Sequence, residues 1–290
     1  MRPRVAVLPG DGIGPEVIEA AVDTVTPHAE VSFVPAGADR FLAKGELLTP
    51  DDMATIAGSD AVLFGAVGDS RVPDGVLERG ILLRLRAELD LYVNVRPFPE
   101  LDLVFVRENT EGLYAGTGAL LDDTAIEVSL NTRAAVSRCI DYAFSLAASR
   151  SGRVTLVHKS NVLKHAGSMW KELFARSAGD NRHVMTFYQH VDAAAYHLVT
   201  DPDRFDVIVT DNMFGDILSD VAAGLAGGLG RAASANLHPD PSTRPTRCLG
   251  LFEPVHGSAP DIAGTGTADP TAAIRAAELL VAALEREPVS

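Results

Sequence analysis

Short apolar runs alternate with amphipathic stretches along much of this chain. Runs rich in Val, Ile, Leu and Phe predict strands, and apolar positions three and four residues apart predict helices. Three strand–helix pairs follow this pattern, at residues 4–8 and 15–25, 61–64 and 75–89, and 206–210 and 217–229. The alternation is typical of an α/β protein in which at least part of the sheet is parallel.

A different pattern interrupts this alternation in the middle of the chain. Residues 91–106 and 113–128 have the composition of strands, and a helix is predicted over 131–148. We therefore expect a second domain, residues 92–226, inserted between the two halves of a first domain. Those halves are residues 1–91 and 227–290.

Composition and charge narrow the classes of function. The chain has 290 residues, of which 47% are hydrophobic and 22% charged, as in ordinary globular proteins. A formal net charge of -14 argues against nucleic acid as a partner, and an anionic substrate would need a local cluster of arginines. No apolar run is long enough to span a membrane, and no secretion signal is expected. Cys139 and Cys248 lack metal-binding or redox spacing, which favours a reducing cytoplasm.

Two carboxylates stand at the start of a predicted helix. Asp216 and Asp220 are four residues apart, after a buried strand, so both project from one helix face near the carboxyl end of that strand. A divalent cation such as Mg2+ or Mn2+ would relieve their repulsion and leave positions open for substrate oxygens. A charge pair favoured by the helix dipole explains the same spacing equally well. Asp211 fits a turn residue better than a third ligand.

An arginine cluster that would bind an anionic substrate is available in the first half of the chain. Its candidates are Arg79, Arg84, Arg86, Arg96 and Arg107. Arg86 follows Leu82 by four residues, so a carboxylate-binding side chain and an apolar one share a helix face, which suits a carboxylate with a small hydrocarbon branch. A solvated face with i,i+4 ion pairs is the alternative, and it fits Arg84 better.

A dinucleotide fingerprint is not present after the first strand. The third glycine of Gly10–Gly14 comes one residue too early for G-x-G-x-x-G, so this segment is predicted to be a tight turn. Residues 253–264 are a better candidate for a cofactor loop because they offer free backbone donors, His256 and an acidic residue. Asp261 would accept hydrogen bonds from ribose hydroxyls and repel a 2′-phosphate, which favours NAD over NADP. Tyr114 and Lys159 are candidates for proton transfer, although for either residue in isolation a packed tyrosine or a solvated lysine is the more ordinary explanation.

Six segments in order resemble one family. They are residues 8–16, 82–86 with 94–97, 106–114, 158–163, 211–220 and 253–269. Together they resemble the isocitrate/3-isopropylmalate/homoisocitrate dehydrogenase family of β-decarboxylating dehydrogenases. The resemblance implies a two-domain α/β fold with a parallel or mixed sheet, helices on both faces and an inserted dimerisation domain, distinct from a Rossmann fold. It places the cofactor on the first domain and the dimer interface with the metal and substrate residues on the second.

The resemblance also implies roles for matched residues. The substrate-binding residues would be Leu82, Leu83, Arg86, Arg96 and Arg107. The metal ligands would be Asp192, Asp216 and Asp220. The cofactor-binding residues would be His256, Gly257, Ser258, Ala259, Asp261, Ile262 and Asp269. The catalytic residues would be Tyr114, Lys159 and Asp192, of which Lys159 and Asp192 would reach the site from a neighbouring subunit, so a homodimer with shared active sites is implied.

Substrate choice is less narrowly defined. The apolar Ile81–Leu83 beside Arg86 favours 3-isopropylmalate or a related alkylmalate, whereas Asn109–Glu111 is closer to isocitrate and homoisocitrate members of the family. A phosphonate-bearing malate analogue of a specialised pathway, a catalytically silent regulatory subunit and a sugar or nucleotide binding protein are the alternatives. The segments 97–103 and 116–126 are short for the family and the chain ends early, so we expect reduced stability and a weaker dimer.

Overall fold

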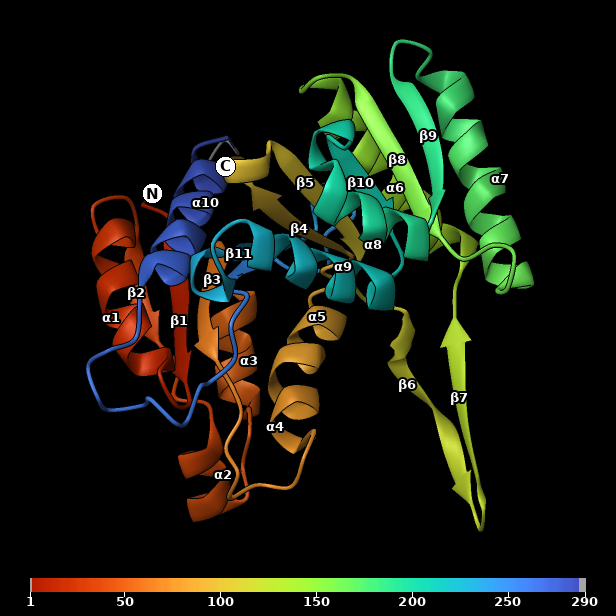
Figure 1. Ribbon diagram of the computed structural model, residues 1–290. Coiled ribbons are helices and arrows are strands. Elements are labelled where there is room, and N and C mark those ends of the chain that lie inside the picture. Colours follow the sequence, from red (N-terminus) through yellow and green to blue (C-terminus); the bar gives the residue numbers. More distant parts are fainter. Residues whose placement is uncertain (1, 287–290) are drawn as a thin grey trace. The chain divides into compact units, whose positions relative to one another are not determined.

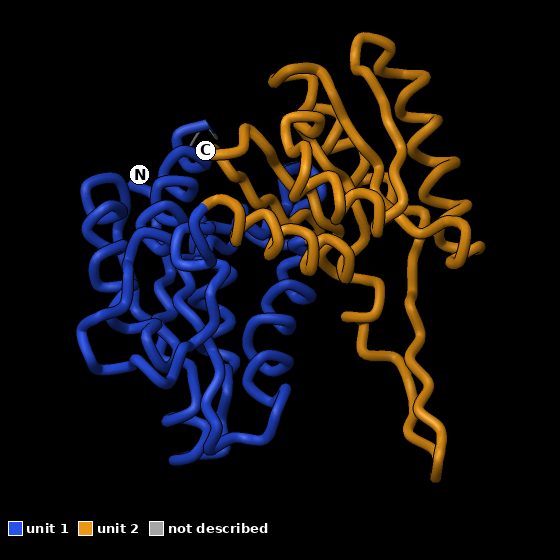
Figure 2. Tube along the Cα trace, viewed as in Figure 1, with its two compact units in different colours: residues 1–91, 227–290 blue, residues 92–226 orange. Residues whose placement is uncertain are grey.

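The computed structural model describes residues 2–286 (Figure 1). These residues form two compact units, one made of the chain up to Leu91 together with the chain from Gly227 onward, and one running from Tyr92 to Ala226 (Figure 2). The division falls at the residues expected from the sequence, whereas the roles assigned to the two units stay predictions. Among the described residues, no helix is both long and apolar enough to cross a membrane.

Unit 1 contains a five-stranded stretch of mixed sheet. Its strands are β1 (Arg4–Gly10), β2 (Glu30–Phe33), β3 (Ala61–Ala66), β11 (Ala233–Leu237) and β12 (Gly250–Pro254). Their order is β2-β1-β3-β12-β11, and all neighbouring pairs are parallel except β11 with β12. This order differs from the 3-2-1-4-5-6 order of a Rossmann fold, in agreement with the expected fold.

Helices cover both faces of this sheet. They are α1 (Gly14–Val25), α2 (Ala38–Lys44), α3 (Pro50–Ala57), α4 (Val76–Glu78), α5 (Arg84–Glu88) and α10 (Thr271–Arg286). α10 packs on α1, β11 and β12, and the opposite face carries a core in which Phe64 and Leu251 meet Ile56 of α3 and Leu85 of α5. The expected helix over 75–89 is interrupted by a π-helical turn, Arg79–Leu83, between α4 and α5.

Unit 2 repeats the plan with a second five-stranded stretch and a separate hairpin. The stretch consists of β4 (Val93–Phe98), β5 (Leu103–Glu108), β8 (Arg153–His158), β9 (Met185–His190) and β10 (Val207–Thr210), in the order β4-β5-β10-β8-β9. Only β4 is antiparallel to its neighbour. β6 (Gly112–Leu121) and β7 (Thr124–Leu130) form the hairpin, and they stand apart from the sheet (Figure 1).

Four helices cover the two faces of this second sheet. They are α6 (Arg133–Ala148), α7 (Lys164–Asp180), α8 (Val191–Thr200) and α9 (Asn212–Leu225). α6 and α7 share one core with Val106, Leu156 and Val209 of the strands, and α8 packs on α9. α9 begins five residues before the expected start because the Asp211 side chain accepts a 2.8 Å hydrogen bond from the Phe214 N–H and caps the helix.

Parallel strands end at the same edge of each sheet, which brings the segments after them together. In unit 1 the segments after β1, β3 and β12 begin at Asp11, Val67 and Val255. In unit 2 those after β5, β8, β9 and β10 carry Tyr114, Lys159, Asp192 and, on α9, the carboxylate pair. Ligands of open α/β sheets bind at this edge, so the fold collects the candidate residues where chemistry is expected.

Candidate active site

The predicted carboxylate pair lies on the first half of α9 and faces two arginines. Arg96 Nη2 is 3.0 Å from Asp216 Oδ1, and Arg96 Nη1 is 3.1 Å from Asp220 Oδ1. Arg107 Nη1 also donates to Asp216 Oδ1. The structure therefore brings together four of the residues predicted for substrate and metal.

Both arginines come from strand positions and are buried. Arg96 lies on β4 and Arg107 lies on the neighbouring strand β5. In the register of these strands Arg107 is opposite Asn94, which is two residues before Arg96. Arg96 donates from Nε to Asn94 Oδ1 (2.9 Å) and from Nη1 to Ser219 Oγ (2.9 Å). These bonds hold the planar guanidinium group in one orientation.

Arg107 is more deeply buried than Arg96, with a relative exposure of 1%. Its Nε and Nη2 atoms donate to Asn212 Oδ1 at 3.0 and 2.6 Å, and its guanidinium carbon lies 4.9 Å from the centre of the Tyr114 ring. A Cβ atom added at Gly215 would lie 2.7 Å from Arg107 Cγ, so α9 can approach the arginine this closely only with glycine at that position.

Tyr114 completes this group. Its hydroxyl donates a 2.5 Å hydrogen bond to Asp216 Oδ2. Burial raises the pKa of Tyr114, the nearby charge of Arg107 lowers it, and the bond to Asp216 raises it again, with a net increase. The hydroxyl is therefore protonated at neutral pH, as an acid that donates a proton must be.

The carboxylates fit a hard divalent cation. Asp216 and Asp220 present oxygen donors four residues apart on one helix face, and Mg2+ in proteins is commonly held by one or two carboxylates together with substrate oxygens and water. Burial raises the pKa of Asp220, while Arg96 lowers it and Asp216 raises it further, with a net increase. Within the described part of the chain, no group of three or more His, Cys, Asp or Glu is placed to hold a metal.

The third predicted metal ligand, Asp192, lies elsewhere in unit 2 beside Lys159. The Lys159 Nζ atom is 2.5 Å from Asp192 Oδ1, and this hydrogen bond lowers the pKa of Asp192. The two residues follow neighbouring strands, β8 and β9, which explains how residues 33 positions apart meet. One copy of the chain therefore pairs Asp192 with Lys159 and does not group it with Asp216 and Asp220 into a metal site.

The remaining predicted substrate residues belong to unit 1. Arg86 on α5 is buried, and its Nη2 atom is 3.1 Å from Glu253 Oε1 at the end of β12. Asn236 Nδ2 donates to the same oxygen at 2.8 Å. Leu82 and Leu83 are half-buried within the π-helical turn. Arg84 pairs with Glu88 four residues later, which matches the alternative considered for it.

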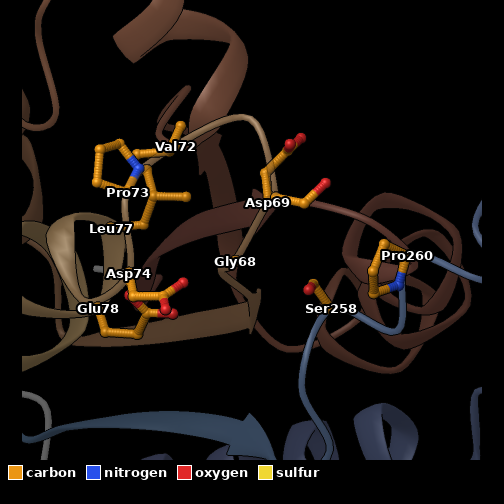
Figure 3. A pocket seen from close by; sticks show the side chains of 10 residues that line it. Gly68, Asp69, Val72, Pro73, Asp74, Leu77, Glu78, Ser258 and Pro260 are labelled. Carbon is orange, nitrogen blue, oxygen red and sulfur yellow. The ribbon is translucent and has the colours of Figure 1, made fainter.

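The predicted cofactor loop lines a pocket of about 160 Å³ in unit 1 (Figure 3). Ser258 and Pro260 form one wall, and residues from Gly68 to Glu78 form the other. Ala259 has a φ of 39°, a left-handed conformation that side chains rarely adopt. The Nε2 atom of His256 is buried and makes no hydrogen bond within the protein, so the loop retains a polar atom suited to a ligand. The loop therefore fits a polar cofactor.

Several residues of these sites were not predicted. They are Asn94, Asn212 and Ser219 beside the arginines, Glu253 and Asn236 beside Arg86, and Asp69, Asp74 and Glu78 in the pocket. Asn94 and Asn212 lie within the motif segments, so a polar residue in a buried strand and one at a helix start were the available signals. Glu253 opens the 253–269 segment, but its pairing with Arg86 gave no local signal because the two residues lie 167 positions apart.

Comparison with known proteins gives consistent similarities over nearly the whole chain. The family model for isocitrate/isopropylmalate dehydrogenase matches residues 4–288. A 3-isopropylmalate dehydrogenase of Nocardia farcinica is 49% identical over 299 residues, covering 96% of this chain and 88% of that protein. A 3-isopropylmalate dehydrogenase of Leifsonia xyli is 50% identical over 319 residues, covering 99% and 87%.

Solved structures agree with the fold. The isocitrate dehydrogenase of Methylococcus capsulatus matches with a TM-score of 0.87 and 38% identity, covering 97% of this chain and 86% of that one. A β-decarboxylating dehydrogenase of Thermococcus kodakarensis, in its apo form, matches with a TM-score of 0.82 and 41% identity, covering 98% and 84%. These similarities confirm the α/β fold expected from the motifs.

Proposed function

The chain belongs to the isocitrate/isopropylmalate dehydrogenase family, and on this basis we propose that it oxidises and decarboxylates 3-isopropylmalate, with NAD as hydride acceptor and Mg2+ or Mn2+ as metal. The observation that carries this function is the buried Arg96–Arg107 pair facing Asp216, Asp220 and the Tyr114 hydroxyl. The relatives' names favour an isopropyl substrate over an isocitrate-like or phosphonate-bearing one. The retained acid, base and carboxylate residues argue against a silent subunit.

Arginines bind the substrate in this proposal. Arg96 and Arg107 would hold the carboxylates of the malate core, and Arg86 would add a third contact beside Leu82 and Leu83, which would receive the isopropyl group. Planar guanidinium groups suit carboxylates because they donate two parallel hydrogen bonds. Since Asn94, Asn212 and Glu253 already orient these side chains, little ordering is required when the substrate binds.

Proton transfer falls to two groups. Lys159, held by Asp192, would take the proton of the C2 hydroxyl while hydride leaves C2 for NAD. Loss of CO2 from the β-carboxylate then leaves a carbanionic carbon, which the Tyr114 hydroxyl would protonate. When bound by Asp216 and Asp220, the divalent metal supplies electrophilic stabilisation of the C2 oxygen.

A homodimer with shared active sites is part of the proposal. Asp192 and Lys159 form a pair apart from Asp216 and Asp220, which is the arrangement expected if each pair completes the site of another copy. The β6–β7 hairpin and α8 also expose large apolar side chains: Leu120, Leu121, Ile126, Val128, Tyr196 and Val199. Exposed apolar groups of this extent commonly mark an interface.

The cofactor assignment uses the pocket of unit 1. We assign His256, Gly257, Ser258, Ala259, Asp261, Ile262 and Asp269 to NAD, with Asp261 toward the ribose hydroxyls. Asp261 is exposed and so is available to a ligand. Both cysteines are free and buried, which supports a reducing, cytoplasmic location.

The test is NADH formation with Mg2+ or Mn2+ across 3-isopropylmalate, isocitrate, homoisocitrate, malate and tartrate. We expect turnover with 3-isopropylmalate well above the others, and loss of it when EDTA removes the metal. Preference for isocitrate would overturn the substrate assignment. Absence of turnover with all five by a folded dimer would favour the silent subunit.

A further inference from the structure

The turn Gly10–Gly14 has no part in the proposed chemistry, yet it lies at the carboxyl end of β1 beside both walls of the pocket. Its backbone is tied to the end of β3, because the Asp11 N–H donates to Ala66 O at 2.7 Å. A Cβ atom on Gly10 would lie 1.8 Å from that same oxygen, so the two strand ends are in direct contact.

Asp11 holds the first wall. Its carboxylate is buried and accepts the Gly68 N–H at Oδ2 (3.1 Å) and the Ala38 N–H at Oδ1 (2.7 Å). Gly68 is a lining residue of the pocket. Gly37 also lies against the Asp11 carboxylate, since a Cβ atom on Gly37 would be 2.4 Å from Asp11 Oδ1. The carboxylate thus joins the segments after β2 and β3 to the turn after β1.

The same turn holds the second wall through its backbone. The Ile13 N–H donates to Ser258 O at 2.8 Å, and a Cβ atom on Gly12 would lie 2.0 Å from that oxygen. Glu16, at the start of α1, accepts the Gly264 N–H farther along the cofactor loop. Ser258 lines the pocket beside Gly68, since a Cβ atom on Gly68 would lie 3.1 Å from Ser258 Oγ (Figure 3), so both walls are attached to one short segment where they meet.

We propose that Asp11 is a positioning residue for the cofactor: its carboxylate, with the backbone of the same turn, fixes the separation of the two pocket walls. The inference rests on the proposed function, in which NAD binds against Ser258. A carboxylate suits this task because it accepts from several N–H groups at once, and such charge-assisted bonds are stronger than neutral ones.

An ordinary buried carboxylate that only stabilises the fold would give a different result from a positioning residue. Loss of stability alone would lower the melting temperature and leave the affinity of the folded protein for NAD unchanged. Loss of wall positioning would weaken NAD binding while the substrate arginines and the proton-transfer residues, none of which Asp11 contacts in the bonds above, keep their function.

The test compares Asp11→Asn with the wild type in the full chain. The Asn side chain would point amide hydrogens at one of the two N–H groups, so one bond is lost. We expect the dissociation constant of NAD, measured by calorimetry below the melting temperature, to rise about tenfold. In the absence of NAD, hydrogen exchange should be faster in peptides containing Ala38 and Gly68. The kcat at saturating NAD and the KM for 3-isopropylmalate should stay near wild-type values.

Two further variants complete the design. Glu19→Gln removes an exposed carboxylate from the same helix, α1, and should change none of these quantities. Asp11→Ser serves if Asp11→Asn does not fold; it removes the carboxylate, so it should weaken NAD binding with faster exchange around Ala38 and Gly68. A folded Asp11→Asn or Asp11→Ser with wild-type NAD affinity and exchange would overturn the positioning role. Failure of the wild type itself to bind NAD would instead overturn the proposed cofactor site.

Discussion

The hydroxyl of Tyr114 donates a 2.5 Å hydrogen bond to Oδ2 of Asp216, one of the two carboxylates assigned to the metal. The proposed acid and a proposed metal ligand are therefore in direct contact. A cation held by Asp216 would compete with the hydroxyl for the same carboxylate.

Removal of the Tyr114 hydroxyl distinguishes its role as the acid from its hydrogen bond to Asp216. In Tyr114→Phe we expect kcat to fall about a hundredfold, because general acid catalysis typically contributes 10²–10⁴ in rate. Affinity for Mn2+, titrated by electron paramagnetic resonance, should be equal to or higher than that of the wild type, since a competing donor to Asp216 is gone. An unchanged kcat would exclude Tyr114 as the acid.

The close approach of α9 to Arg107 predicts an effect at Gly215. Gly215→Ala would place Cβ 2.7 Å from Arg107 Cγ and displace the stem of the arginine. We expect the KM for 3-isopropylmalate to rise about tenfold, since small displacements of a substrate-positioning group are costly. Gly224→Ala is the matched control, because Gly224 lies on the same helix and the added carbon would meet no atom within 4 Å beyond its chain neighbours and the backbone of its own helix. It should stabilise the protein by about 0.5–1 kcal/mol and leave KM unchanged.

Asp211 predicts a pH-dependent stability. Burial raises the pKa of the Asp211 carboxyl from 3.8 to about 6, so this group binds a proton more tightly in the folded chain than in the unfolded chain. The stability linked to Asp211 is therefore present below pH 4 and is lost as pH rises through about 6, by about 3 kcal/mol. Asn caps helices as well as Asp does, so Asp211→Asn should keep the bond to Phe214 without this loss.

Denaturant unfolding of Asp211→Asn against the wild type at several pH values checks this. The variant should be more stable at pH 8, and the difference should shrink toward zero as the pH is lowered to 4. His158, whose Nε2 atom is 3.6 Å from Asp211 Oδ2, has its pKa lowered by burial to about 4, so no ion pair is lost at neutral pH. Equal stabilities across the range would contradict the prediction.

The apolar face of the hairpin predicts which residues would form the interface of the proposed homodimer. Strand register places Leu121 and Ile126 on the same face of β6 and β7, with exposures of 55% and 44%. Leu121→Ser with Ile126→Ser should weaken dimerisation by about 3 kcal/mol, or roughly a hundredfold in dissociation constant. Sedimentation equilibrium measures this, with Asp123→Ser at the turn of the same hairpin as control. A variant that dimerises like the wild type would place the interface elsewhere.

Local patterns predicted much of the site. Asp216 and Asp220 were found from helical spacing after a buried strand, and both properties are local, so their shared face followed directly. The strands near 91–106 and 113–128 were likewise visible in composition. Arg96 and Arg107 were candidates for an anion-binding cluster from the sequence alone, and the resemblance to the family assigned them to the substrate carboxylates and added Asp192.

Contacts between distant segments could not be predicted in this way. Arg86 meets Glu253 only because α5 and the end of β12 share one edge of the sheet in unit 1, and this depends on strand order. The π-helical turn at Arg79–Leu83 was not predicted either, because the apolar spacing over 75–89 fits an ordinary helix and Gly80 does not by itself distinguish a π-helical turn from other interruptions. The same holds for Asp11, which the sequence indicated only as part of a tight turn.

The insertion of unit 2 within unit 1 has a consequence for synthesis. β12 lies between β3 and β11, so when the ribosome has produced the first 91 residues, the β3 edge has no neighbour on that side. An unpaired parallel edge is prone to wrong pairing. We expect the continuous unit, Tyr92–Ala226, to be able to fold first, while the N-terminal segment waits for the last sixty or so residues to close its sheet.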